Sequence, residues 1–167
     1  MTKKSCLKKG LVMALVMGAV LSLAGCPKEA GSSGGGEGSN FNIASVEGTW
    51  SYETLHVIFS SDSFSLKIGS LNNNPIEDAS GPIIKTLKNN KTSVVGIIVK
   101  NTTGVSTLTK KDKYHTFYLK KINLNSSIDM HIPLGEDGDD TLEEAETAFY
   151  ELSDYPTYID SDTYLYQ

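Results

Sequence analysis

The stretch TWSYETLHVIFSSDSFSLKIG, residues 49–69, decides the fold class. Residues 49–59 are rich in β-branched and aromatic side chains, which favour strands. Apolar and polar residues then alternate from Phe64 to Gly69, the period-2 pattern of a half-buried strand. Because the serines and aspartate at 60–62 have turn composition, the whole stretch is predicted to form a β-hairpin.

Two further pairs of strand-like segments follow. They are 82–88 with 93–100, and 114–122 with 127–132. The polar stretches 71–80 and 101–112 are predicted loops. The most apolar run of the folded part, 94–99, is predicted to be a central strand, with Gly96 as a bulge.

The chemistry changes near the C-terminus. Thr141 and Glu144 have the spacing of a capping box, and apolar residues recur at helical spacing over 142–152. Pro156 is expected to end this helix, and 157–167 to form a last strand. Six or seven short strands and one helix predict a mainly β protein, a small antiparallel up-and-down barrel or meander.

The N-terminus has the pattern of a bacterial export signal. Four lysines precede residues 11–23, which carry no charge. Thirteen residues are too few to span a bilayer, which needs about 20, but they suit a signal peptide. The small residues Ala24 and Gly25 come before Cys26, and this arrangement resembles the lipobox of bacterial lipoproteins. The resemblance implies that residues 1–25 are removed and that Cys26 receives acyl chains such as palmitate.

The rest of the chain divides into a tether and a domain. Residues 26–40 are dominated by Gly and Ser and are predicted to be a flexible tether. Residues 41–167 are long enough for one domain with its own core. No cysteine remains after Cys26, so we expect neither a disulfide nor a cysteine metal site.

The charge balance excludes some partners. Removal of the signal would leave 11 lysines against 20 acidic residues, with no arginine anywhere. This argues against nucleic acid as a partner. Residues 85–121 hold nine lysines and one acid, whereas 129–162 hold twelve acids and no lysine. We expect these two blocks to neutralise each other, the alternative being a bipolar surface that orients a charged partner.

The motif Gly48-Thr49-Trp50 lies at the start of the first strand-like run and resembles the lipocalin and wider calycin signature. With the later strand pairs and the helix, the chain is similar to spirochaete (treponemal-type) lipoproteins that have a lipocalin-like domain. The resemblance implies a barrel with Trp50 at its closed end. Lipocalins usually stack an arginine over this tryptophan, and this chain has none.

No catalytic or cofactor site is predicted. The three histidines, His56, His115 and His131, all fall on predicted strands, where a shared metal ion is not expected. The acidic stretch 136–140 lacks the glycine and glutamate positions of an EF-hand and is predicted to be a solvated loop. The tyrosines of 150–166 suit either a binding face or the wet edge of a small core.

These observations predict a lipoprotein anchored in the bacterial envelope, with the outer membrane or cell surface favoured. Its barrel would bind a small apolar ligand or a partner macromolecule. The alternative is a structural or interaction protein with a filled core, no ligand and no catalytic activity. No enzyme activity is expected in either case.

Overall fold

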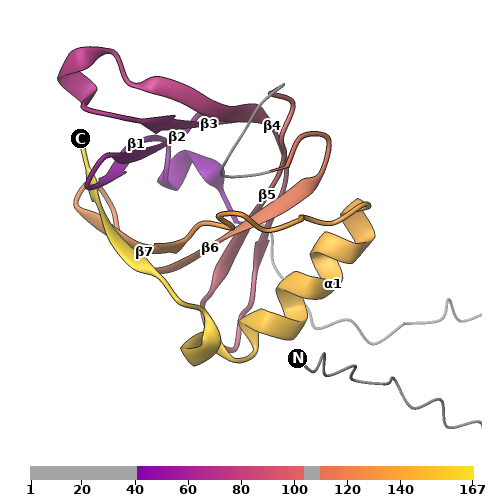
Figure 1. Ribbon diagram of the computed structural model, residues 1–167. Helices are drawn as coiled ribbons and strands as arrows, with labels where there is room; N and C mark the ends of the chain where they lie inside the picture. Colours follow the sequence, from indigo (N-terminus) through magenta and orange to yellow (C-terminus); the bar gives the residue numbers. More distant parts are fainter. Residues whose placement is uncertain (1–40, 104–109) are drawn as a thin grey trace, which may run out of the picture. The chain divides into compact units, whose positions relative to one another are not determined.

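The computed structural model describes residues 41–103 and 110–167, so the predicted signal, Cys26 and the tether lie outside the described residues. Eight antiparallel strands follow in chain order, and the last pairs with the first to close a barrel (Figure 1). The strands are β1 (Gly48–Tyr52), β2 (Leu55–Phe59), β3 (Ser63–Ile68), β4 (Ile76–Lys88), β5 (Val95–Lys100), β6 (Tyr114–Asn123), β7 (Ser127–His131) and β8 (Asp162–Tyr166). The predicted mainly β, up-and-down barrel with one helix near the C-terminus is confirmed, and the strand number is eight rather than six or seven.

The deciding stretch 49–69 forms three strands, so the prediction of a single hairpin was wrong. The chain reverses at Glu53 and Thr54, between β1 and β2. Glu53 has a positive φ of 52°, a conformation that permits a tight turn. Its neighbours are strand-like on both sides, and composition alone therefore does not reveal this turn.

Two other boundaries also differ from the prediction. β4 begins at Ile76, inside the expected loop 71–80, because the short 3-10 helix η2 (Leu71–Asn73) and Asn74, with φ 51°, reverse the chain early. β4 then pairs first with β3 and later with β5. Near the C-terminus, the 3-10 helix η3 (Pro156–Tyr158) precedes β8, so the expected strand over 157–167 is shorter.

The barrel interior is filled by apolar side chains, to which all eight strands contribute. Phe117 packs edge-on against Phe59 with ring centroids 5.6 Å apart, and Phe64 lies 5.7 Å from the same ring. The largest of these interior side chains are less than 2% exposed; they are Trp50, Phe59, Leu66, Ile97, Phe117, Leu119, Ile128 and Met130. An eight-stranded barrel is just wide enough to be filled in this way.

The helix α1 (Leu142–Ser153) covers the outer faces of β5 and β6 and forms a second core with them (Figure 1). β5 is therefore buried on both sides, which explains its continuous apolar run. Gly96 is not a bulge, because its pairing with β4 and β6 is regular. A Cβ at Gly96 would lie 2.5 Å from the ring of Phe149, so the glycine makes room for the helix.

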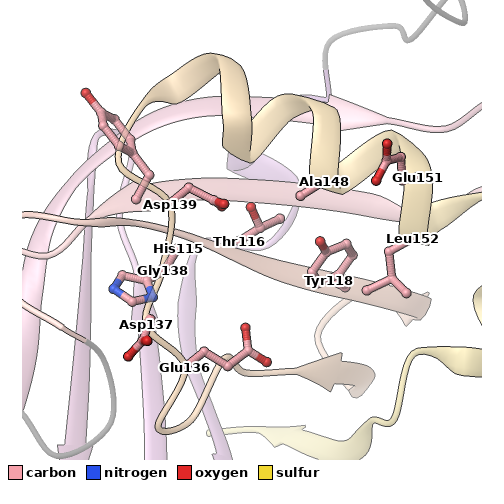
Figure 2. Close-up of a pocket in the computed structure, with 11 residues that line it drawn as sticks. His115, Thr116, Tyr118, Glu136, Asp137, Gly138, Asp139, Ala148, Glu151 and Leu152 are labelled. Carbon is pink, nitrogen blue, oxygen red and sulfur yellow. The ribbon is translucent and has the colours of Figure 1, made fainter. Parts of the chain in front are cut away.

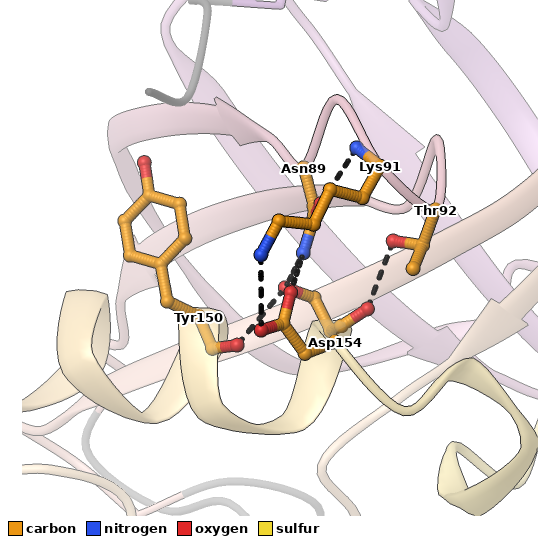
Figure 3. Close-up of polar contacts among 6 residues, drawn as sticks. Asn89, Lys91, Thr92, Tyr150 and Asp154 are labelled. Atoms are coloured by element: carbon orange, nitrogen blue, oxygen red, sulfur yellow. Dashed lines mark hydrogen bonds and ion pairs between the residues drawn. The ribbon is translucent and has the colours of Figure 1, made fainter. Parts of the chain in front are cut away.

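Both ends of α1 are fixed by specific hydrogen bonds. The capping box is confirmed: Thr141 Oγ1 accepts from the backbone of Glu144, and the Glu144 carboxylate accepts from the backbone of Thr141. The last turn has no basic residue. Instead, the turn after β4 caps it (Figure 3), where Thr92 donates to Ser153 O at 2.8 Å and Asn89 donates to Asp154 Oδ1 at 2.8 Å.

The lysine-rich and acidic blocks meet across the fold, as the charge pattern predicted. Five ion pairs each join a lysine of 85–121 to an acid of 129–162. They are Lys85–Glu146, Lys91–Asp154, Lys110–Asp137, Lys113–Asp140 and Lys121–Asp129. These pairs are at the surface and contribute little stability individually. Within the described residues, no helix combines the length and the apolar character needed to span a membrane.

Candidate functional site

The Gly48-Thr49-Trp50 motif opens β1 and lies at one end of the barrel. Trp50 is 1% exposed, and its indole N–H donates to Val46 O at 2.8 Å. The ring of Tyr166 meets it edge-on, with centroids 5.1 Å apart. Gly48 is needed because a Cβ there would lie 2.5 Å from the Tyr166 ring. Gly48 and Trp50 of this motif therefore serve packing.

The three histidines occupy separate environments. His56 is buried on β2, where Nδ1 accepts from Ser51 at 2.7 Å and Nε2 donates to Gly69 O at 2.6 Å. His131, on β7, lies 3.4 Å from Glu136 through Nε2. His115 is 1% exposed at the start of β6. Among the residues that the structure describes, no group of three or more His, Cys, Asp or Glu is arranged to hold a metal ion.

A groove of about 480 Å³ lies between α1, β6 and the loop that leads into α1 (Figure 2). Its volume is in the range of small-molecule sites. We call it the helix groove. The residues that line it are Tyr114, His115, Thr116, Tyr118, Glu136, Asp137, Gly138, Asp139, Ala148, Glu151 and Leu152.

The acidic loop is held against β6 by backbone hydrogen bonds. Tyr114 and Asp139 exchange two of them, at 3.0 and 2.9 Å. Gly138 has a φ of +69°, and a Cβ there would lie 2.6 Å from Cε1 of His115. The loop therefore passes closely over the imidazole, and this position requires glycine.

Two buried polar atoms of the helix groove have no hydrogen-bond partner within the described part of the chain: Nδ1 of His115 and Oγ1 of Thr116. Nε2 of His115 lies 2.9 Å from Lys110 O. Since a carbonyl only accepts, Nε2 carries the proton, and Nδ1 presents a lone pair. Burial lowers the pKa of His115, which favours this neutral form. A buried polar atom without a partner costs about 1–3 kcal/mol. Side chains alternate along β6, and Thr116 is on the face that packs against α1, so its Oγ1 is the atom placed to meet a ligand in the groove.

The acidic residues of the helix groove influence one another. Burial and the nearby Glu144 raise the pKa of Asp139, with Glu136 adding to the effect. The hydrogen bond from His131 lowers the pKa of Glu136, and the same contact raises the pKa of His131. Burial, together with Glu136 and Asp139, raises the pKa of Tyr118, so its phenol stays protonated. The groove therefore combines negative charge with neutral hydroxyl groups.

A smaller hollow of about 230 Å³ lies beside the helix groove, where β7 and β8 meet the same loop. Glu136 lines both hollows, and its contact with His131 lies between them. Nδ1 of His131 also donates to Asp160 O at 2.7 Å. The His131–Glu136 pair thus ties the acidic loop to the barrel wall.

The sequence identified only part of this site. It singled out His115 and the acidic stretch 136–140, but it did not join them. Thr116 and Glu151 were missed because their placement depends on how α1 lies over β6. A polar Thr116 inside the apolar run of β6 was the one available signal. Comparisons with protein-family models, with curated proteins and with solved structures found no match to this chain.

Proposed function

We propose that this chain is a lipid-anchored binding protein of the bacterial cell envelope, with no catalytic role. Acyl chains on Cys26 would anchor it, and residues 27–40 would let the domain stand away from the bilayer. The supporting features are the basic start, the uncharged run 11–23 and the small residues before Cys26. Two or more acyl chains suffice for stable anchoring.

The barrel fold is compatible with ligand binding, and the filled interior indicates where binding would occur. An apolar ligand in the lumen would have to displace side chains such as Phe59 and Phe117, which are at most 1% exposed. The helix groove offers about 480 Å³ and the unpartnered hydroxyl of Thr116. The proposal rests on this contrast between a filled barrel interior and an open helix groove. The groove would take a polar small molecule or a polar segment of a partner.

A second candidate function is an interaction protein that takes no small ligand. The filled interior favours it, as do Tyr155 and Tyr158, which are 60% and 76% exposed and whose rings lie 5.9 Å apart. Exposed tyrosine pairs are typical of protein contact surfaces.

Two measurements test the proposal. Intact-mass analysis of protein from a bacterial host should show loss of residues 1–25 and added acyl mass, and C26S should abolish both. Retention of Met1 would contradict the anchor. Native mass spectrometry of the full chain, exposed to a cell extract in non-ionic detergent, should show a retained small molecule. A persistently unliganded mass would favour the interaction protein instead.

A further inference from the structure

The hydrogen-bonding groups of the helix groove are dominated by acceptors. The carboxylate oxygens of Glu136, Asp139 and Glu151 are acceptors. Thr116, which is 6% exposed and unpartnered, can both accept and donate. A ligand that satisfies this set must be a donor at several points.

The charge of the helix groove also favours a ligand that donates hydrogen bonds. Asp137 is paired with Lys110, and Glu136 contacts His131. Asp139 and Glu151 form no ion pair with any lysine or histidine of the described residues, 41–103 and 110–167. Unlike the acids that meet the lysine-rich block, these two leave their negative charge uncompensated, which attracts a cation.

We propose that the helix groove binds a small organic ammonium ion that carries a second hydrogen-bond donor, such as a short diamine or amino alcohol. This inference rests on the proposed role of the groove as a binding site. The ammonium would pair with Asp139 or Glu151, which lie toward opposite ends of α1 (Figure 2), and the second donor would reach Oγ1 of Thr116 on the face of β6 that α1 covers. Charge-assisted hydrogen bonds of this kind are about twice as strong as neutral ones.

Other ligand classes fit the same groups less well. A bare metal ion would need three or more converging ligands, and the described residues hold no such group. An anion, including the phosphate of a lipid headgroup, would be repelled by the acids. An apolar molecule would leave Oγ1 of Thr116 unsatisfied.

The test compares three ligands with the same four-carbon backbone: 1,4-diaminobutane, 1,4-butanediol and succinate. Each is titrated into the 15N-labelled full chain in non-ionic detergent, and the amide shifts of Thr116 and Gly138 are followed. We expect saturable shifts with the diamine, at least tenfold weaker binding of the diol and none of succinate. Glycerophosphoethanolamine, which presents an ammonium beside a phosphate, should bind at least tenfold more weakly than the diamine.

Matched variants locate the binding. E151Q and D139N each remove one negative charge from the groove, and E47Q makes the same change on an exposed residue outside it. E151Q and D139N should weaken diamine binding about fivefold or more, and E47Q less than twofold. T116V, nearly isosteric, should weaken it about threefold. Preserved amide dispersion in each variant would show that the fold is intact.

Several outcomes would overturn the inference. Equal shifts with diol and diamine would exclude recognition of the charge, and equal losses in E47Q and E151Q would indicate general attraction to an acidic surface. If the diamine fails but a cell extract shifts Thr116 and Gly138, the ammonium chemistry is wrong while the groove remains a binding site. If neither causes a shift, the binding function fails as well.

Discussion

Replacing Gly96 with alanine tests the packing that positions α1 over the barrel. The new Cβ would lie 2.5 Å from Cδ2 and 2.6 Å from Cε2 of Phe149. Ordinary carbon contacts are about 3.5–4.0 Å, so the ring would have to retreat by roughly 1 Å. It has little room, because Phe149 is fully buried and stacks on Tyr118 with centroids 5.9 Å apart.

The expected cost follows from two opposing effects. Overpacking of a filled core costs about 1–3 kcal/mol. Alanine also restricts the unfolded chain more than glycine does, which stabilises by about 0.4–1 kcal/mol. We therefore expect G96A to lower the free energy of unfolding by about 1–2 kcal/mol.

The matched control is the same substitution in a chain that carries F149L. The smaller side chain leaves space for the new methyl group, so Gly96→Ala should there be neutral or stabilising. Urea unfolding of the full chain in non-ionic detergent, followed by the fluorescence of the single, buried Trp50, measures all four variants of this double-mutant cycle. If G96A costs the same free energy in both backgrounds, the contact with Phe149 is not the reason for the glycine.

Two further perturbations test the elements around the helix groove. T141A removes the N-cap of α1 and should destabilise by about 1 kcal/mol in the same unfolding assay, whereas T141S should cost little; equal losses in both would refute the capping role. The His131–Glu136 contact should make stability depend on pH, because a raised histidine pKa stabilises the fold below about 6.5 and this gain is lost as the pH rises through the folded value. Glu136, with its lowered pKa, should contribute above about 4.5 and lose this contribution as the pH falls. The difference in unfolding midpoint between wild type and H131N should therefore be largest between about pH 4.5 and 6.5, and a difference that does not change with pH would exclude this pair as its source.

Much of the fold follows from local patterns. Alternation over β3 and the apolar run of β5 indicated strands, and the Thr141–Glu144 spacing located the start of α1. These signals are strong because each depends on neighbours within a few residues. The turn at Glu53 and the early start of β4 were missed, since a residue with positive φ inside a strand-like or asparagine-rich run has no distinct composition.

The sequence by itself determined the class of the domain, its helix, the pairing of its two charge blocks and the expectation of a lipid anchor at Cys26. The tertiary structure decided that the barrel closes with eight strands and that its lumen is filled. It also decided that Gly96 makes room for Phe149 and that His115, Thr116 and Glu151 line one groove. These features join residues far apart in the chain, and their geometry depends on strand register and on how a helix packs against a sheet, neither of which a local pattern encodes.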